Sequence, residues 1–393
     1  MVTYLDHAAT APLRPEAAAA TIAQLGRPGG NSTGAHALAR ASRKVVEEAR
    51  DVVAECLGCQ PAEVVFTSGG TESDNLAVAG TLAVAGGLPV CSAIEHHAVL
   101  HPVAAAGGRT APVHPDGTVD LDALAAVLAE EEAVTFVSVM LVNNETGVVQ
   151  PLAEVAAVVA EHAPGAVLHT DAVQAVPWLG AAALAPAQLV SVSAHKLGGP
   201  QGVGALVVRR GTALRAQLLG GGQELERRSG THNVAGIAGF AAALAATVAD
   251  RSLSEPAVAA RRDRLADGLL VAVPGAVETG RRADKVAGTC HLLFEGIESE
   301  ALLVALDQQG VCASAASSCA SGALEPSHVL AAMGVSRQAA KGALRLSLGA
   351  TTTDAEVDHA LAVIPSAVAR LRRHDPLVFR EAPAAAGSGR GAS

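Results

Sequence analysis

Short apolar runs alternate with helix-like segments along the first two-thirds of the chain, and this alternation limits the fold more than any other feature. Most of the strand-like runs are separated by segments with helical periodicity, such as residues 152–162. The runs lie at residues 64–66, 89–93, 134–141, 167–169, 189–192 and 203–208. Strands that alternate with helices are typical of a mostly parallel sheet with helices on both faces. The sequence therefore predicts an α/β fold.

The chain is long enough for two domains. Its 393 residues are more than a single domain with one hydrophobic core usually contains. Because only 2% of the residues are aromatic, the hydrophobic cores must be built from Ala, Val and Leu. Glu255 and Pro256 interrupt a helical pattern, which predicts a break and a domain boundary there. A smaller α/β unit should follow, with helices at 257–271, 299–308 and 353–373 and strands at 289–294 and 343–348.

These boundaries divide the chain into four predicted parts. Residues 1–15 should pack with the small domain, residues 16–253 should form the large domain, and residues 254–376 should form the small C-terminal domain. Residues 377–393 are expected to be a disordered tail, because the end of the chain is rich in Ala, Gly and Ser.

Charge and cysteine content exclude several classes of function. The formal net charge of −10 gives no basic surface for direct binding of nucleic acid or anionic lipid. The first residues lack a basic and then apolar segment, and no run approaches the about 18 uncharged apolar residues of a membrane span. Six cysteines show no disulfide-framework spacing and would stay thiols in a reducing compartment. We expect a cytoplasmic protein that makes no membrane contact.

Lys196 and Asp171 are the first pair with recognisable chemistry. Lys196 follows the apolar run at 189–192, and Asp171 ends another run about 25 residues earlier. A lysine amine can form a Schiff base with the aldehyde of pyridoxal phosphate, while a carboxylate can pair with its protonated pyridine nitrogen. Alone, each residue could be a surface lysine or a helix N-cap. Together with the motifs below, they predict a pyridoxal-phosphate site.

Candidate phosphate donors come from separate segments. Residues 68–72 form a Gly-rich turn that opens a helix at Thr71, and a helix N-terminus favours an anion. Ser193 and His195 could add hydroxyl and imidazole donors. Residues 228–231 could add another donor. The Gly-rich turn could also be an ordinary tight turn, and residues 228–231 could be an ordinary loop.

Further candidates lie in loops after predicted strands. His96 could lie over a cofactor ring and exchange protons, whereas the adjacent His97 lacks the partners that a metal site needs, so no metal is expected. Asn144 could serve a phenolic oxygen or belong to a plain turn. Small residues surround Cys319, which would keep its thiol exposed for nucleophilic attack. Arg345, inside an apolar strand, could clamp a substrate carboxylate or make an internal ion pair.

In order along the chain, six segments resemble successive motifs of the NifS/IscS-like cysteine desulfurases of the class-V aminotransferase family. They lie at residues 4–10, 67–75, 143–147, 193–196, 228–231 and 317–319. The resemblance covers residue 4 to about residue 373. It implies the pyridoxal-phosphate-dependent transferase fold of aspartate aminotransferase (fold type I). That fold has a large domain with a mostly parallel seven-stranded sheet and a smaller C-terminal α/β domain, and the family forms homodimers.

The resemblance also implies roles for residues. Lys196 would form the Schiff base, His96 would stack on the ring and move protons, and Cys319, on a loop of the small domain, would accept sulfur. The implied cofactor-binding residues are Gly70, Thr71, His96, Asn144, Asp171, Gln174, Ser193, His195, Lys196 and Thr231. Of these, Thr231 would reach across the dimer interface. Asn31 and Arg345 would hold the substrate carboxylate.

The implied reaction converts L-cysteine to L-alanine and leaves a persulfide on Cys319 for an acceptor protein. The acceptor would be an iron–sulfur scaffold or a tRNA-thiolating enzyme, and Cys319 could contact a cluster in a scaffold complex. Ala316 replaces a usual glycine and Gln201 a frequent lysine, and no proline follows Asn31; these departures bear on loop flexibility and partner choice. Selenocysteine lyase or a related lyase, and a non-catalytic scaffold that binds a partner, remain alternatives.

Overall fold

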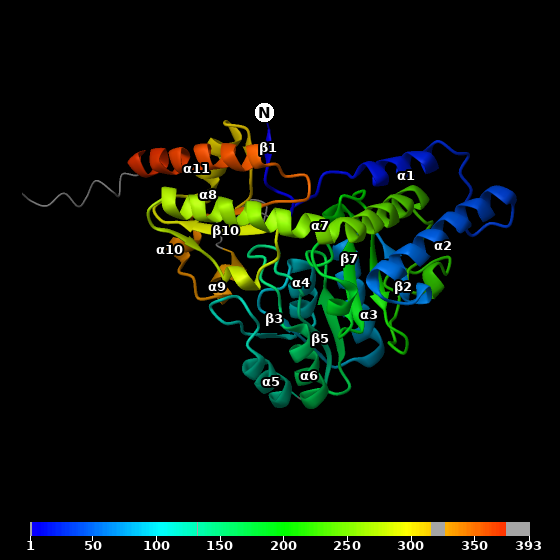
Figure 1. Ribbon diagram of the computed structural model, residues 1–393. Helices are drawn as coiled ribbons and strands as arrows, with labels where there is room; N and C mark the ends of the chain where they lie inside the picture. The colour runs from blue at the N-terminus through cyan, green and yellow to red at the C-terminus, as the bar shows by residue number, and fades with distance from the viewer. Residues whose placement is uncertain (1, 132, 316–326, 375–393) are drawn as a thin grey trace, which may run out of the picture.

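The computed structural model describes residues 2–131, 133–315 and 327–374 (Figure 1). The predicted tail at 377–393 and the predicted nucleophile Cys319 lie outside the described residues. The largest sheet has seven strands in the order β2-β8-β7-β6-β5-β3-β4. Their bounds are β2 Val64–Thr67, β3 Leu88–Ser92, β4 Arg109–Ala111, β5 Val134–Ser138, β6 Val167–Asp171, β7 Leu189–Ser193 and β8 Gly204–Val208. Only β8 runs antiparallel to its neighbours, so the predicted mostly parallel sheet is confirmed.

Helices cover both faces of this sheet. One face packs against α2 (Ala37–Leu57), α5 (Leu121–Glu130), α6 (Leu152–His162) and the first half of α7 (Val234–Ala272). The other face packs against α3 (Gly70–Ala85) and α4 (His97–Ala105). Adjacent strand residues point to opposite faces, so Val64 and Phe66 enter one core and Val65 enters the other. Because both faces are buried, the strands are apolar almost throughout.

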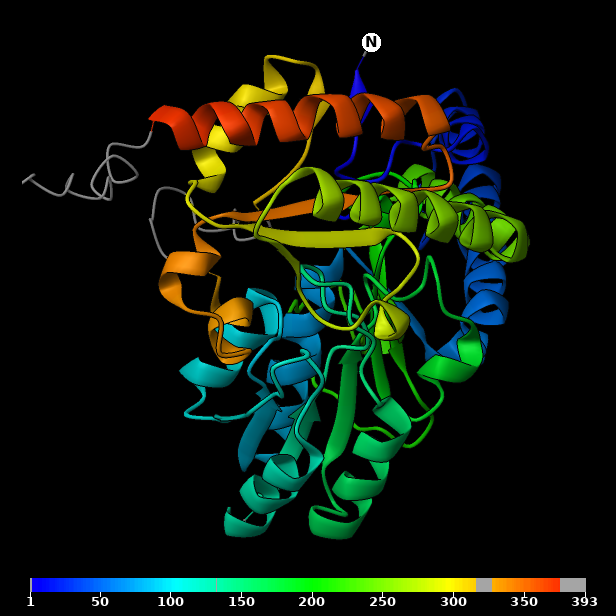
Figure 2. The ribbon, with the colours of Figure 1, turned by 60° about the vertical axis from the view of Figure 1, so that its left-hand side comes forward.

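A smaller unit forms around a three-stranded antiparallel sheet, β12-β10-β9. Figure 2 shows α11 and the second half of α7 covering the side of this sheet that faces away from the large sheet. The strands β1 and β11 pair beside it. The remaining bounds are β1 Thr3–Tyr4, α1 Pro15–Leu25, β9 Ala276–Glu278, β10 Thr289–Phe294, α8 Ser299–Asp307, β11 Val311–Cys312, α9 His328–Ala332, α10 Arg337–Ala340, β12 Ala343–Ser347 and α11 Asp354–His374.

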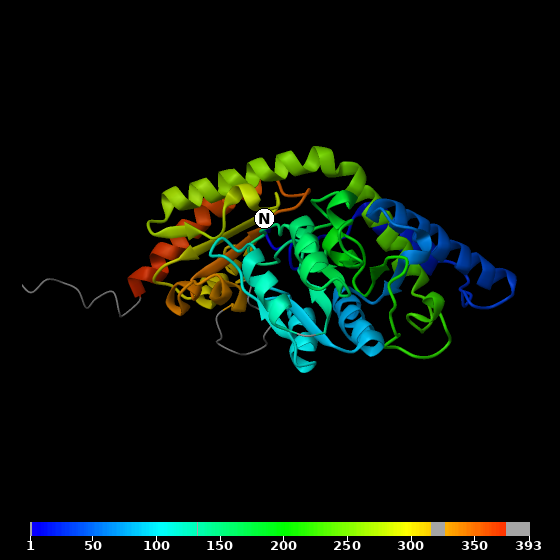
Figure 3. The same ribbon diagram turned by 90° about the horizontal axis from the view of Figure 1, so that it is seen from below.

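The predicted helix break at Glu255 and Pro256 is wrong, because α7 continues through both residues. Figure 3 shows this helix crossing from α2 to the small unit. Proline keeps a φ compatible with a helix and removes only one backbone donor. Buried side chains hold α7 on both sides of it. Those before it are Ile237, Phe240 and Leu244 in the core of the large sheet, and those after it are Val258, Leu265 and Leu269 in the core of the small unit.

The apolar character of α7 comes from this double burial. By length and composition α7 could cross a membrane, which the sequence alone did not lead us to expect. However, 44% of the most apolar 18-residue stretch of α7 is buried inside the protein. Helices of a protein core pass the same test of length and composition, and the residues of α7 in both cores identify it as one of these.

Replacing Pro256 with alanine should stabilise the protein. The substitution supplies the N–H that the helix lacks at this exposed position, and we expect the free energy of unfolding to rise by roughly 1–3 kcal/mol. Urea denaturation measures the change. Pro274→Ala, just beyond the end of α7, is the matched control and should give no gain. If Pro256→Ala is no more stable than the wild type, the continuous helix is not limited by its proline.

Candidate functional site

A cavity of about 320 Å³ lies where loops leave the carboxyl ends of the parallel strands. In open α/β sheets this edge is the usual place for a ligand, because loops from neighbouring strands converge there. Most of the site residues predicted from the sequence line the cavity. They are Gly70, Thr71, His96, Asn144, Asp171, Gln174, Ser193, His195, Lys196 and Arg345.

A second cavity, of about 470 Å³, adjoins the first at the start of α3. The two cavities share Gly70, Thr71, Ser193 and His195. The first N–H groups of a helix lack helical acceptors, and the helix dipole makes this end favourable for an anion. At Gly70 a Cβ would lie 2.9 Å from Val173 Cγ2, so a side chain would crowd this approach to the backbone. A planar ring that carries a phosphate, such as pyridoxal phosphate, fits the joined cavities.

Lys196 follows β7, and Asp171 is the last residue of β6. These two strands are neighbours and run parallel. Lys196 Nζ donates to the carbonyl oxygens of Ala8 at 2.6 Å and Ala9 at 2.8 Å. Asp171 is 6% exposed, and its Oδ1 accepts a bond from Val173 N at 2.8 Å. Burial raises the pKa of Asp171 to about 6, although the bond from Val173 and the charge of Lys196 oppose the rise. A protonated ring nitrogen beside this carboxylate would favour its charged form.

His96 is held at the start of α4. Its Nδ1 accepts a bond from Ala98 N at 3.1 Å, which assigns the proton of the neutral ring to Nε2. Burial lowers the pKa of His96 to about 4, and the charge of Lys196 adds to this effect. The imidazole is therefore uncharged near neutral pH. A neutral ring can both pack on a planar ligand and accept a proton.

Arg345 comes from β12 of the small unit. Its Nη2 pairs with Asp6 Oδ1 at 2.9 Å, and its Nη1 donates to Asn144 O at 2.8 Å. The buried Nε has no hydrogen-bond partner within the described ranges. The internal ion pair considered from the sequence is therefore present, and Arg345 also lines the cavity. Gln174 Nε2 donates to the same Ala8 carbonyl as Lys196, at 2.8 Å.

Asn31 and Thr231 do not line either cavity of this single chain, and both are exposed. Asn31 Oδ1 instead accepts bonds from its neighbour two residues along. Ser32 Oγ lies 2.8 Å from His232 Nδ1, so the segments that carry Asn31 and Thr231 are neighbours. The roles assigned to Asn31, to Thr231 across a dimer interface and to Cys319 stay predictions.

Asp74, which was not predicted from the sequence, also lines the first cavity. Asp74 is 1% exposed, and its Oδ1 lies 3.6 Å from His169 Nε2 without a hydrogen-bond partner in the described part of the chain. Burial and the nearby Asp171 raise its pKa. Asp74 lies four residues after Gly70 on α3, and this helical spacing could have revealed it. Among residues with a described position, no group of three or more His, Cys, Asp or Glu could hold a metal ion.

The described residues that flank positions 316–326 are anchored beside the cavity. On one side, Ser314 exchanges backbone bonds with Arg345 at 3.2 and 2.7 Å. On the other side, Ser327 Oγ donates to Glu145 Oε2 at 2.5 Å. His328 Nε2 lies 2.9 Å from the carbonyl oxygen of Glu95, the residue before His96. These contacts connect both flanks of the Cys319 segment to residues around the site.

Known proteins share this architecture over nearly the whole chain. Residues 3–360 match the family model described as aminotransferase class-V. An IscS-like cysteine desulfurase of Mycobacterium tuberculosis is 44% identical over 95% of this chain and 98% of its own. A solved NifS-like protein is 32% identical, covers 94% of this chain and 100% of its own, and gives a TM-score of 0.87. A solved structure of SspA in complex with cysteine is 27% identical, covers 89% of this chain and 100% of its own, and gives a TM-score of 0.75. The chain therefore belongs to the class-V aminotransferase family, in the NifS/IscS-like branch of pyridoxal-phosphate-dependent cysteine desulfurases.

Proposed function

We propose that this protein removes sulfur from L-cysteine and leaves L-alanine and a persulfide on Cys319. The observation that carries the proposal is the convergence of Lys196, Asp171 and His96 on one cavity, next to a second cavity suited to a phosphate. The cysteine-bound SspA structure supports the choice of substrate. The similarity of this chain to cysteine desulfurases favours this reaction over selenocysteine lyase activity.

The chain's residues divide the work on the cofactor and substrate. Pyridoxal phosphate, when bound, withdraws electrons from the substrate α-carbon. Lys196 would hold the cofactor aldehyde through its amine, and this amine would also take up the α-proton. Asp171 would hold a proton on the ring nitrogen, and His96 would cover the ring. The N–H groups at the start of α3 and Ser193 Oγ line the second cavity and would hold the phosphate.

We propose that Cys319 accepts the sulfur by nucleophilic attack. Its thiolate attacks the sulfur of the bound cysteine, so a new S–S bond forms while the carbon–sulfur bond of the substrate breaks. The electron pair of the broken bond stays with the carbon fragment, which takes up a proton and leaves as alanine. Arg345, which lines the cavity, would hold the substrate carboxylate during this step.

Glu95, the residue before His96, lies inside the protein. It is completely buried, and its Oε1 accepts bonds from Ser92 Oγ and Met140 N, both at 2.6 Å. Burial raises the pKa of Glu95 to about 8, although these two bonds oppose the rise. The carboxyl is therefore protonated near neutral pH and adds no charge beside the site.

We infer that two copies of the chain form the working enzyme. Large apolar side chains are exposed around the segments that carry Asn31 and Thr231, and a second copy would cover them. They are Ile22, Leu25, Leu38, Leu218, Leu219 and Leu225. In such a homodimer Thr231 would serve the partner's phosphate cavity.

The partners proposed for the sulfur are proteins. An iron–sulfur scaffold or a tRNA-thiolating enzyme would take it from Cys319, so that no nucleic acid need bind this chain directly. We also propose a cytoplasmic location. The five described cysteines are free thiols, which supports a reducing compartment.

The direct test is turnover of L-cysteine by the cofactor-loaded protein in the presence of a reductant. We expect equal amounts of alanine and sulfide over many turnovers. Cys319→Ser should keep the absorption of the bound cofactor but release no sulfide, because serine cannot carry a persulfide. Turnover of selenocysteine but not cysteine by the wild type, or undiminished sulfide from Cys319→Ser, would refute the assignment.

Lys196→Ala should remove the long-wavelength absorption of the lysine-bound cofactor. Activity should fall by about a thousandfold or more, since the amine also moves the α-proton. Absorption spectra and alanine release measure both effects. Lys44→Ala, at an exposed lysine on α2, is the control and should change neither. A normal spectrum in Lys196→Ala would exclude the proposed role of this lysine.

Glu95→Gln should change how stability depends on pH. The folded wild type keeps Glu95 protonated up to about pH 8, whereas the unfolded chain ionises it near the ordinary glutamate pKa of 4.5. Stability of the wild type relative to Glu95→Gln should therefore fall as pH rises through this window, by roughly 2–4 kcal/mol. Urea denaturation from pH 5 to pH 8 measures the difference. Parallel curves for the two proteins would show that Glu95 is not held protonated.

A further inference from the structure

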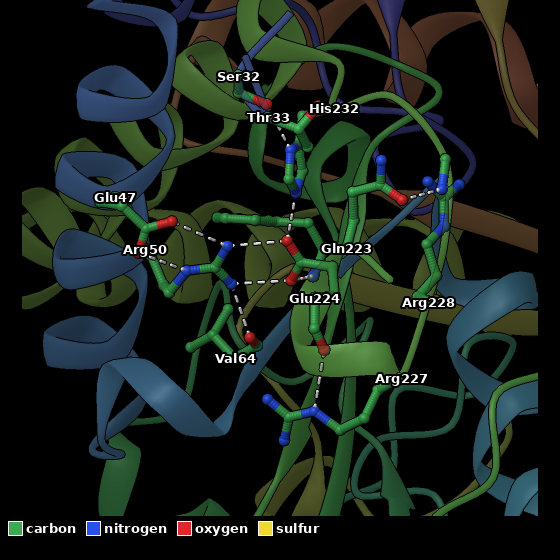
Figure 4. Close-up of polar contacts among 12 residues, drawn as sticks. Ser32, Thr33, Glu47, Arg50, Val64, Gln223, Glu224, Arg227, Arg228 and His232 are labelled. Atoms are coloured by element: carbon green, nitrogen blue, oxygen red, sulfur yellow. Dashed lines mark hydrogen bonds and ion pairs between the residues drawn. The ribbon is translucent and has the colours of Figure 1, made fainter. Parts of the chain in front are cut away.

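Glu224 is a buried carboxylate that joins three parts of the large unit outside both cavities (Figure 4). Its two oxygens accept bonds from Arg50 Nη1 and Nη2 of α2, each at 2.8 Å. Phe66 N of β2 donates to it at 2.8 Å, and His232 Nε2 lies 2.6 Å from it. A carboxylate with this many donors is firmly fixed, and removal of one partner of a buried ion pair is unfavourable.

The backbone around Glu224 is strained. Glu224, Leu225 and Glu226 have φ values of 52°, 55° and 63° in succession. Residues with a Cβ rarely adopt this left-handed conformation, and a run of three persists only where other contacts hold it. The bonds to the Glu224 side chain are the ones that tie this turn to α2 and β2, in addition to the backbone bonds within the turn. We call residues 224–226 the left-handed turn.

The left-handed turn leads directly to a contact in the wall of the second cavity. Arg228 pairs with Glu72 through Nε at 2.7 Å and Nη2 at 3.2 Å. Glu72 lines that cavity, and its Oε2 also accepts the bond from Ser68 N at 2.8 Å. Burial favours the neutral form of Glu72, but the bonds from Arg228 and Ser68 prevail and lower its pKa, so it is charged.

A charged carboxylate beside a phosphate needs a cation. Without Arg228, the negative charge of Glu72 in the cavity wall would repel an anion bound in that cavity. The guanidinium offsets this charge and fixes the carboxylate in one place. The position of the Arg228 side chain depends on the backbone that precedes it, and the left-handed turn lies in this backbone, separated from Arg228 by one residue.

We propose that Glu224 is a positioning residue for the phosphate end of the cofactor: its bonds to Arg50 hold the left-handed turn that aims Arg228. The proposal rests on the cofactor site described above and adds to it a residue that touches neither cofactor nor substrate. Glu224 is also connected to the segment that carries Asn31, because His232 contacts both Glu224 and Ser32.

Glu224→Gln tests the proposal with Glu226→Gln as its matched control. Glu226 lies in the same turn but is exposed. Its replacement makes the same change of charge and leaves the bonds of Glu224 to Arg50 and Phe66 in place. In cofactor-free protein, calorimetry with inorganic phosphate and with pyridoxal phosphate should show binding about tenfold weaker in Glu224→Gln than in Glu226→Gln. Measurement at a temperature where both variants are folded separates this effect from lost stability.

A double-mutant comparison shows whether the effect passes through Arg228. Arg228→Gln should weaken phosphate binding to a similar extent, and adding Glu224→Gln to it should weaken binding no further. Additive losses, or phosphate binding by Glu224→Gln equal to that of Glu226→Gln, would overturn the proposal. If Glu224→Gln does not fold, Arg50→Lys takes its place, because lysine keeps the charge but cannot make both bonds. Failure of the wild type to bind pyridoxal phosphate would count against the cofactor site. The comparison with inorganic phosphate would still test whether Glu224 affects binding of an anion in the second cavity.

Discussion

The parallel pairing of β6 and β7 is the constraint on which the site depends. Asp171 pairs with Ser191 in register, so the end of β6 and the segment that follows β7 leave the sheet at the same edge. Asp171 and Lys196, separated by about 25 residues of chain, therefore meet in one cavity. The turns after β2 and β3 reach the same edge, because parallel strands direct all their carboxyl ends to one side.

Burial then decides the charge of each group at this edge. His96 is neutral because burial and the positive Lys196 both disfavour its protonated form. Burial likewise favours the protonated forms of Glu95 and Asp74. The His169 ring beside Asp74 adds no positive charge, because burial lowers the pKa of His169 to about 3. At Asp171 the positive charge of Lys196 opposes the rise in pKa that burial causes. Negative charge is therefore favoured at Asp171, where a ring nitrogen would lie, and at Glu72, where Arg228 offsets it.

The two units act together through a few direct connections. The helix α7 enters both cores, and the small unit supplies Arg345, which bonds to Asp6 and to the Asn144 carbonyl of the large unit. Ser327 and His328 make similar links from the start of α9 to Glu145 and Glu95. A substrate carboxylate at Arg345 would therefore lie between the two units.

The sequence by itself determined the elements and the chemistry. Apolar periodicity located the strands of the large sheet, and local motifs singled out most of the residues that line the cavities. Tertiary structure decided the rest. The sequence could not show that α7 continues through Pro256, because packing in two cores outweighs the local preference of proline. It also could not place Asp74 beside Asp171 or connect Arg50 to Glu224, which lie far apart in the chain. Spacing along a sequence predicts which side chains share a helix or strand face, whereas contacts between distant segments are fixed only when the whole fold packs.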